Sequence, residues 1–307
     1  MDKISIIGGA GTLGAAVANN LATNQQINEI CLIDINENLL LNHIMDLQNA
    51  FPAKALYAGS YEDLKNSSII IVTAGIPNRN DISSRDVFIE GNLQLFNQFG
   101  NEIAKHAPDA LIVTASNPVD ALNYFLYSRF GFNRNQLIGY TRNDSLRFEW
   151  ALRRNVPFKR NDSLYTPVIG EHGNTQVPVF SQIKRNDQPF HITNEQKEKV
   201  IEELRNWFIN YNNLQINRTT GWTTAHGMGR LVEMLVDSSL SKTTGSAILH
   251  GEYGFSNISM GVPITINNEG IKTIDQWELN EMEQTALSKS ADHLQEIIKQ
   301  HILTKQI

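Results

Sequence analysis

Residues 4–14 read ISIIGGAGTLG, a short apolar run that is followed directly by closely spaced glycines. The run predicts a buried strand, and Gly9, Gly11 and Gly14 fit the pattern G-x-G-x-x-G that joins such a strand to a helix in dinucleotide-binding folds. There the first glycine permits a tight turn, the second lets the backbone approach a pyrophosphate, and the third lets helix and strand pack closely. The stretch therefore predicts the start of a doubly wound parallel sheet.

The residues around this turn predict which dinucleotide it holds. A helix that starts at Thr12 and Leu13 would offer its unpaired N–H groups to the phosphates. Asp34, at the end of the next apolar run, would accept hydrogen bonds from the adenosine ribose and repel a 2′-phosphate. Residues 35–37 contain no arginine to offset that repulsion, so we expect NAD rather than NADP. The alternative is a glycine-rich turn with a helix-capping Asp34 and no ligand.

Short apolar runs alternate with helical patterns through the first half of the chain, as in an α/β fold with a parallel sheet. Further strands are expected at 29–33, 68–73, 110–114 and 136–138, and helices at 12–23, 36–49 and 85–106. After about residue 140 the pattern changes to mixed α+β, with turn signals at 185–189 and 267–270.

We therefore expect two domains, a Rossmann domain at 1–140 and a catalytic, substrate-binding α+β domain at 141–307. No Gly/Ser- or Pro-rich linker separates them, which predicts that they pack together around a cleft. The last helical pattern, 279–302, has an expected core stripe made of Met282, Ala286, Leu294, Ile297 and Ile298.

Composition restricts the partners and the compartment. The 307 residues include 26 Lys and Arg and 32 Asp and Glu, a net charge of −6 that attracts neither nucleic acid nor an anionic membrane. The single cysteine, Cys31, excludes an internal disulfide and a multi-thiolate metal site. No apolar run approaches the ~18 residues of a membrane span. We expect a cytoplasmic protein without a targeting segment or a bound metal.

Candidate residues for proton transfer occur in the second half of the chain. Hydride transfer from an alcohol to a nicotinamide needs a base, a cation that holds the acid substrate, and a polarising group. His172 lies in the run GEHG at 170–173, where we expect it to face the cleft rather than be buried. Asp144 and Arg147 are three residues apart and share one face of a helical pattern. From spacing alone, an intrahelical ion pair explains these two residues better than catalysis does.

Several short motifs together resemble the lactate/malate dehydrogenase family of NAD-dependent L-2-hydroxy-acid dehydrogenases, and the match runs through nearly the whole chain. They are the glycine motif at 9–14, Asp34, AGIP at 74–77, SR at 84–85, SNPVD at 116–120, DSLRF at 144–148 and GEHG at 170–173. The resemblance implies an oxidoreductase that interconverts a 2-hydroxy acid and its 2-keto acid, assembled as a homodimer or homotetramer.

The resemblance also implies roles for individual residues. His172 would accept the hydroxyl proton while Asp144 holds its other ring nitrogen, and Arg147 would bind the substrate α-carboxylate in a two-pronged hydrogen bond. Arg85, on a loop that closes, would polarise the carbonyl, and Asn117 would hydrogen-bond the reacting oxygen. Cofactor contacts are expected from Gly9, Gly11, Thr12, Leu13, Gly14, Asp34, Ala74, Gly75, Asn92 and Asn117.

One loop residue sorts the substrates of this family. Six positions before the loop arginine, glutamine accompanies lactate-type enzymes and arginine accompanies malate-type enzymes; here that position is Arg79. A second guanidinium would pair with the distal carboxylate of oxaloacetate and would be unpaired against pyruvate. This favours malate and oxaloacetate over L-lactate or another L-2-hydroxy-monocarboxylate. The alternative for Arg79 is a solvated surface arginine.

The chain also departs from the family pattern. The loop at 78–84 is longer by one residue, which could bring Asn78 to the sorting position and could admit a bulkier 2-keto acid. Asn143 replaces the leucine that usually precedes the aspartate, and Asn174 replaces the aspartate that usually follows the histidine turn. Thr223 and Thr224 resemble family residues near the substrate tail.

Two other functional classes share some of these features. NAD-dependent glycosidases also combine a dinucleotide domain with a Ser/Thr-Asn-Pro strand end, but they use a metal that is held partly by cysteine, and Cys31 lies on the second strand. A non-catalytic NAD-binding sensor would keep the fold without needing the complete set of His172, Asp144, Arg147, Arg85 and Asn117.

Overall fold

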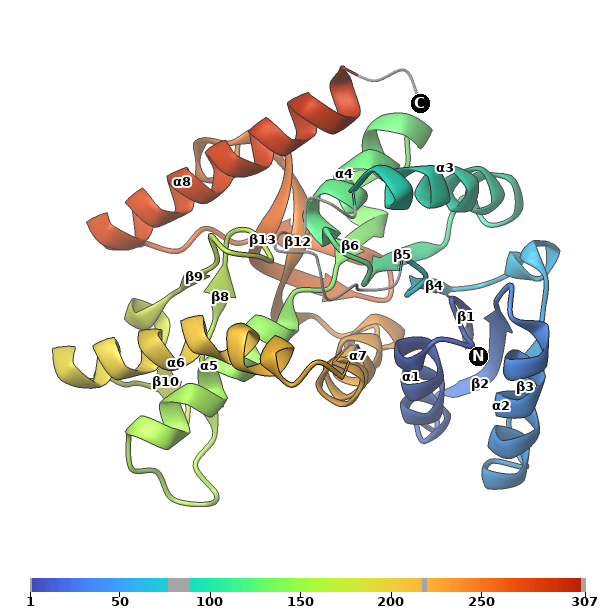
Figure 1. Cartoon of the computed structure of the whole chain (residues 1–307), viewed down its shortest axis with the longest axis horizontal. Coiled ribbons are helices and arrows are strands. Elements are labelled where there is room, and N and C mark those ends of the chain that lie inside the picture. Colours follow the sequence, from blue (N-terminus) through green and yellow to red (C-terminus); the bar gives the residue numbers. More distant parts are fainter. Residues whose placement is uncertain (1, 77–88, 217–219, 305–307) are drawn as a thin grey trace.

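The computed structural model of the chain describes residues 2–76, 89–216 and 220–304 (Figure 1). Asn78, Arg79 and Arg85 of the expected substrate loop lie outside the described residues. The described part is built around a nine-stranded sheet in the order β14-β13-β12-β6-β5-β4-β1-β2-β3. Its parallel half consists of β1 (Asp2–Ile7), β2 (Ile27–Ile33), β3 (Ala55–Ala58), β4 (Ile69–Val72), β5 (Leu111–Thr114) and β6 (Leu137–Gly139).

The parallel half is the doubly wound Rossmann arrangement that the sequence predicts. All four residues of β4 and all four of β5 are buried, because helices cover both faces of the sheet. Helices α1 (Thr12–Ala22) and α2 (Glu37–Ala50) lie on one side, and α3 (Ile89–His106) and α4 (Val119–Phe130) on the other (Figure 1). The strand order reverses between β1 and β4, where such sheets bind ligands at the carboxyl ends of their strands.

Two elements of this half were not predicted, and each has a physical reason. β3 has four residues, of which one is buried, so its apolar signal is short and weak. α4 is buried along residues 119–126, including Asp120 and Asn123, so it lacks the one-sided apolar stripe of a surface helix.

The second half of the chain extends the same sheet. The antiparallel strands β12 (Ser241–His250), β13 (Ser256–Asn267) and β14 (Gly270–Ile274) join it where β12 pairs with β6. The turns expected at 185–189 and 267–270 are confirmed as the β10–β11 and β13–β14 connections. Helices α5 (Arg142–Asn155) and α6 (Asn194–Asn213) enclose a separate apolar cluster that includes Phe148, Leu152 and Val200.

Two more helices and five two-residue strands complete the described part of the second half. They are α7 (Gly221–Val236), α8 (Glu281–Ile298), β7 (Leu164–Tyr165), β8 (Val168–Ile169), β9 (Val177–Pro178), β10 (Lys184–Arg185) and β11 (Gln188–Pro189). Single turns of 3-10 or π-helix occur at Tyr61–Leu64, Arg134–Gln136, Phe180–Gln182, Glu252–Gly254 and Lys299–Leu303. In the described parts of the chain, no helix has the length and apolarity needed to traverse a bilayer.

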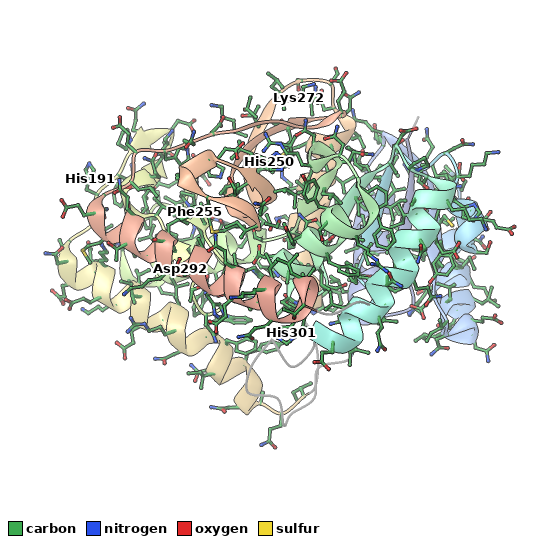
Figure 2. The ribbon with its side chains drawn as sticks, turned by 90° about the horizontal axis from the view of Figure 1, so that it is seen from above. His191, His250, Phe255, Lys272, Asp292 and His301 are labelled. Atoms are coloured by element: carbon green, nitrogen blue, oxygen red, sulfur yellow. The ribbon has the colours of Figure 1, made fainter. Side chains whose placement is uncertain are left out.

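The core stripe expected on α8 is partly wrong. Leu294, Ile297 and Ile298 are buried, but Met282 is 72% exposed. The stripe instead begins at Glu283, which is buried because its carboxylate accepts hydrogen bonds from the backbone N–H and the hydroxyl of Ser181. Figure 2 shows α8 lying across one face of the molecule with Asp292 on its length.

Candidate active site

The glycine turn between β1 and α1 fits the pyrophosphate of a dinucleotide. The N–H groups of Gly8 and Gly9 both donate to the carbonyl of Ile33, at 2.8 and 3.1 Å, which fastens the turn to the end of β2. Gly11 and Thr12 are exposed, whereas Leu13 and Gly14 are buried. As far as the described residues show, α1 starts with neither a side-chain cap nor an acid in its first turn. Its first N–H groups therefore remain available to an anion.

Asp34 lies beside this turn at the end of β2. One carboxylate oxygen accepts a hydrogen bond from the N–H of Ala10 at 3.0 Å, and the other accepts from the N–H of Asn36 at 2.9 Å. Asn36, not Asp34, is the N-cap of α2, so the helix-capping alternative for Asp34 is wrong. Each carboxylate oxygen has a second lone pair, which can accept a hydrogen bond from a ribose hydroxyl.

Asn92 holds together two loops at the carboxyl ends of β4 and β5. Its Oδ1 accepts a hydrogen bond from the N–H of Ile76 at 2.8 Å, and its Nδ2 donates to the carbonyl of Asn117 at 2.7 Å. The Ser116 hydroxyl donates to the carbonyl of Ala74 at 2.5 Å, which adds a second link beside Gly75. The structure thus assembles Ala74, Gly75 and Asn117 around a buried Asn92.

The Asn117 side chain has an unsatisfied acceptor. Its Oδ1 is buried, and none of the described residues donates a hydrogen bond to it. A buried acceptor left in this state costs about 1–3 kcal/mol, which a bound ligand with a suitable donor would relieve. The unsatisfied Oδ1 of Asn117 therefore favours a ligand at the end of β5.

His172 meets Asp144 and Arg147 although it lies 28 residues beyond Asp144 in the sequence. Nδ1 of His172 lies 2.5 Å from Oδ2 of Asp144, and Nη1 of Arg147 lies 3.1 Å from Oδ1 of the same carboxylate. The intrahelical ion pair suggested by the spacing is present, and the same acid also contacts the histidine. Asp144 is thus placed to hold an imidazole and a guanidinium at once.

The expectation that His172 is exposed is wrong. It is only 9% exposed, because the turn between β8 and β9 folds back onto the sheet. Gly170 pairs with Gly261 of β13, and the backbone N–H of His172 donates to Oδ2 of Asp120 at 2.7 Å. These two contacts fix the backbone that leads into His172.

Asp120 is a residue of the site that sequence reasoning missed as a functional group. Burial raises the pKa of the Asp120 carboxyl to about 7. The hydrogen bond from the His172 backbone acts in the opposite direction and lowers this pKa. Nearby Glu171 and Asp144 raise it further. The motif at 116–120 contains Asp120, but nothing in the sequence indicates that it meets residue 172.

Trp207 was also missed. Its ring lies under the Arg147 guanidinium, whose central carbon is 4.2 Å from the ring centroid, and Tyr211 stacks on the same indole at 5.1 Å. A stacked aromatic ring restricts the guanidinium plane and leaves its edges for in-plane hydrogen bonds. The spacing of Trp207 and Tyr211, one helical turn apart, is the only sequence signal of this stack.

The two threonines expected near the substrate tail lie in the first turn of α7. Thr223 is half-buried in the first turn of α7, and Thr224 beside it is buried.

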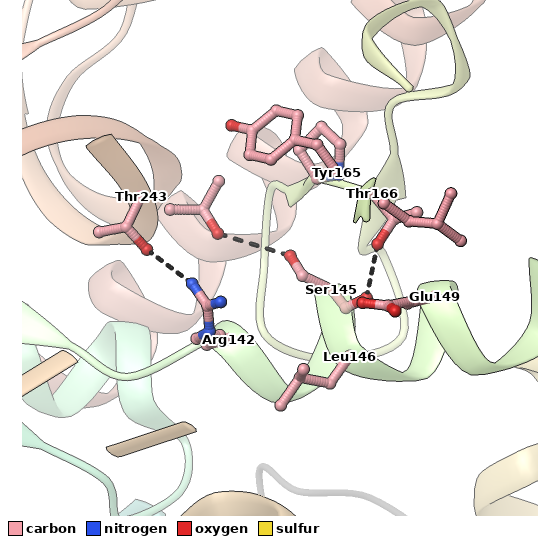
Figure 3. Close-up of a pocket in the computed structure, with 10 residues that line it drawn as sticks. Arg142, Ser145, Leu146, Glu149, Tyr165, Thr166 and Thr243 are labelled. Atoms are coloured by element: carbon pink, nitrogen blue, oxygen red, sulfur yellow. Dashed lines mark hydrogen bonds between the residues drawn. The ribbon is translucent and has the colours of Figure 1, made fainter. Parts of the chain in front are cut away.

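A separate pocket adjoins another face of α5, where Arg142 donates to Thr243 and Ser145 contacts Thr244 (Figure 3). His172, Asp144 and Arg147 do not line that pocket. In the described parts of the chain, no group of three or more His, Cys, Asp or Glu residues is arranged to hold a metal ion.

Alanine substitutions at two glycines separate a ligand site from a merely structural turn. A Cβ at Gly11 would have Gly8 O as its nearest contact, at 3.4 Å, so we expect Gly11→Ala to change stability by less than about 0.5 kcal/mol. It should nevertheless weaken NADH binding about tenfold or more, because the methyl group would reduce the space that a close-approaching pyrophosphate needs. Calorimetric titration with NADH measures this effect.

The matched control is Gly14→Ala. Its Cβ would lie 2.1 Å from the carbonyl oxygen of Gly8, so the helix must move away from the turn, at a cost of about 1–3 kcal/mol in stability. Thermal unfolding should therefore detect Gly14→Ala and not Gly11→Ala. Unchanged NADH affinity in Gly11→Ala would show that the turn does not hold the dinucleotide.

Comparisons with known proteins agree with this geometry. Residues 2–139 match the family model described as lactate/malate dehydrogenase, NAD binding domain, and residues 141–304 match lactate/malate dehydrogenase, alpha/beta C-terminal domain. A malate dehydrogenase of Halobacterium salinarum is 33% identical over 302 residues, which cover 96% of this chain and 97% of that protein. An L-lactate dehydrogenase of Acetivibrio thermocellus is also 33% identical, over 97% of this chain and 96% of that protein.

A solved structure shows the same agreement in three dimensions. The malate dehydrogenase of Cryptosporidium parvum superposes with a TM-score of 0.91 at 26% identity, covering 98% of this chain and 99% of that chain. Both halves of the chain match family models, and the relatives span nearly its full length. The chain therefore belongs to the lactate/malate dehydrogenase family.

Proposed function

We propose that this protein is an NAD-dependent oxidoreductase that interconverts an L-2-hydroxy acid and its 2-keto acid, with malate and oxaloacetate as its substrates. The observation that carries the proposal is the double contact of Asp144 with His172 and Arg147. This contact supports His172 as the proton acceptor and Arg147 as the carboxylate anchor, because a 2-hydroxy acid requires the two groups at a fixed separation. When bound, NAD supplies the acceptor for the hydride that leaves the substrate.

The chain's own residues perform the proton chemistry. Because Nδ1 of His172 contacts Asp144, proton exchange with the substrate falls to Nε2. In the oxidation of the hydroxy acid, Nε2 accepts the hydroxyl proton, and the Asp144 carboxylate stabilises the positive charge that the imidazole acquires. In the reduction of the keto acid, the imidazolium returns the proton to the same oxygen.

The remaining residues bind and orient the substrate. Arg147 receives the α-carboxylate in a two-pronged hydrogen bond, with its plane supported by Trp207 and one end held by Asp144. The Asn117 side-chain N–H donates to the reacting oxygen. For Arg85, the resemblance of the motif at 84–85 supports a role in polarising the carbonyl and excluding water. Gly9 to Gly14, Asp34, Ala74 and Gly75 hold the dinucleotide, with Asn92 supporting the loops.

Substrate choice is the finer part of the proposal. Arg79 supports a C4 dicarboxylate, since its guanidinium would pair with the distal carboxylate and would lose that partner with pyruvate. The relatives include both malate and L-lactate dehydrogenases, so L-lactate is the second candidate. Thr223, at the start of α7, is proposed to line the part of the site that receives the substrate tail.

A substrate panel tests this choice. We expect kcat/KM for oxaloacetate to exceed that for pyruvate, and for a branched 2-keto acid, by about 100-fold or more. Arg79→Gln is the matched variant, and it should lower the value for oxaloacetate while raising that for pyruvate. A wild-type preference for pyruvate would replace malate with lactate as the substrate.

The assembly and the location of the protein are part of the same proposal. We propose a homodimer or homotetramer in the cytoplasm. Residues 1–140 form the NAD-binding domain and also supply Arg79, Arg85 and Asn117 to the substrate, and residues 141–307 form the catalytic, substrate-binding domain. The large apolar residues Leu41 and Met45 on α2 and Trp222 on α7 are exposed in the single chain, which favours a contact with a second copy. Light scattering on the purified protein distinguishes monomer, dimer and tetramer.

A further inference from the structure

A buried chain of hydrogen bonds connects α5 to α7. The Tyr140 hydroxyl donates to Oδ1 of Asn143 at 2.9 Å, and Nδ2 of Asn143 donates to the Thr224 hydroxyl at 2.7 Å. The Thr224 hydroxyl in turn donates to the carbonyl of Thr220 at 2.5 Å. Tyr140, Asn143 and Thr224 are each no more than 5% exposed.

This chain gives a role to Asn143, the residue that replaces the usual leucine of the family. Leucine would fill the space by packing alone, which tolerates small shifts between helices. Asn143 instead uses both ends of its amide, one as acceptor and one as donor. Buried polar groups are costly when unpaired and directional when paired, so a fully paired chain specifies one distance and one orientation.

Two glycines on α7, Gly227 and Gly229, leave room for Tyr140 of this hydrogen-bond chain and for Asn20 on α1. A Cβ at Gly227 would lie 2.0 Å from the Tyr140 hydroxyl, so only glycine at this position on α7 lets that hydroxyl reach Asn143. On the other side of α7, a Cβ at Gly229 would lie 1.8 Å from Oδ1 of Asn20 on α1. Helix α7 thus lies between α1, which carries the glycine turn, and α5, which carries the catalytic acid (Figure 1).

The two central members of the hydrogen-bond chain, Asn143 and Thr224, adjoin the candidate active site. Asn143 directly precedes Asp144, which contacts His172 and Arg147. Thr224 directly follows Thr223, which is half-buried in the first turn of α7. The chain of hydrogen bonds therefore sets the distance between α5, which carries Asp144 and Arg147, and the first turn of α7, which is proposed to face the substrate tail.

We propose that Asn143 is a positioning residue that fixes the first turn of α7 against the first turn of α5 and thereby determines which side chain of the 2-keto acid is accepted. This inference rests on the proposed function. It assigns to Asn143 an effect on the substrate tail, whereas Asp144 and Arg147 act on the reacting carbon and the α-carboxylate.

The test is Asn143→Leu, assayed by NADH consumption with oxaloacetate, a branched 2-keto acid and glyoxylate. Glyoxylate has the reacting carbonyl and the carboxylate but no tail. We expect the ratio of kcat/KM between oxaloacetate and the branched acid to change about tenfold, mainly through KM, with kcat/KM for glyoxylate unchanged. NADH affinity, measured by titration, should also remain unchanged.

Two matched variants separate positioning from loss of stability. Asn143→Leu leaves the buried Tyr140 hydroxyl without its acceptor, and adding Tyr140→Phe removes that penalty. The double variant should regain thermal stability yet keep the altered substrate ratio. Thr224→Val removes the hydroxyl on α7 that accepts the hydrogen bond from Asn143, and it should alter the ratio in the same direction.

The outcomes separate this inference from the proposed function. Unchanged ratios in both Asn143→Leu and Thr224→Val, or equal losses with all three substrates, would overturn the role of Asn143. If the wild-type protein consumes NADH with none of the three acids, the proposed function itself fails.

Discussion

Replacement of His172 by asparagine is expected to lower kcat by about 10²–10⁴-fold while leaving the affinity for NADH unchanged. Asparagine can still donate a hydrogen bond from its amide to Asp144, but it cannot carry a proton to or from the substrate oxygen. The glycine turn and Asp34, which we expect to hold the cofactor, are fixed by their own hydrogen bonds with Ile33, Ala10 and Asn36, so cofactor binding should not depend on the imidazole. Steady-state kinetics with oxaloacetate and titration with NADH measure the two effects separately.

The matched control is His191→Asn. His191 is exposed at the edge of the second half of the chain, away from the N-terminal elements (Figure 2). It should retain wild-type kcat and KM. Turnover within a few-fold of wild type in His172→Asn would remove His172 from the mechanism, and with it the proposed function of this site.

Substitution of Asp144 by asparagine is expected to affect both kcat and KM. An amide cannot accept hydrogen bonds from the His172 ring and the Arg147 guanidinium as the carboxylate does, and it lacks the negative charge that stabilises an imidazolium. If its N–H donates to Nδ1, the ring proton moves to Nε2, which can then no longer accept a proton from the substrate. We expect kcat/KM to fall by about 10³–10⁴-fold, a magnitude typical of an orienting acid in such a pair.

Arg147→Lys is the variant to set beside it. Lysine keeps the positive charge but loses the two-pronged geometry and the stack on Trp207, so KM should rise while kcat changes little. Asp144→Asn should differ by lowering kcat as well. An Asp144→Asn enzyme that lost only stability, with normal kcat and KM, would reduce the residue to an intrahelical ion-pair partner.

The N-terminal half was predictable because its signals are local. Continuous apolar runs mark the buried strands, and the glycines fall where the backbone must turn tightly and helix and strand approach each other. The short β3 and the mostly buried α4 escaped prediction because neither shows a strong periodic pattern. The burial of His172 was missed for a different reason, since it depends on contacts with Asp120 and Gly261 that no local window contains.

The candidate site was predictable only in part. The spacing of Asp144 and Arg147 indicates their ion pair, but the contact with His172 spans 28 residues and was expected only from the family resemblance. The sequence did not indicate that Asp120 contacts His172 or that Trp207 contacts Arg147, because these contacts arise where separate elements meet. Asn143 was noticed as a departure from the family, yet its meaning required the position of Thr224 on another helix.

The pairing of β12 with β6 has a mechanical consequence. A swing of one half of the molecule relative to the other would have to break the hydrogen bonds between these two strands, in the interior of a nine-stranded sheet. One continuous sheet thus runs through both halves and holds the cofactor-binding and substrate-binding regions at a constant separation. Adjustment to a ligand must therefore come from the loops and helices that pack on this sheet.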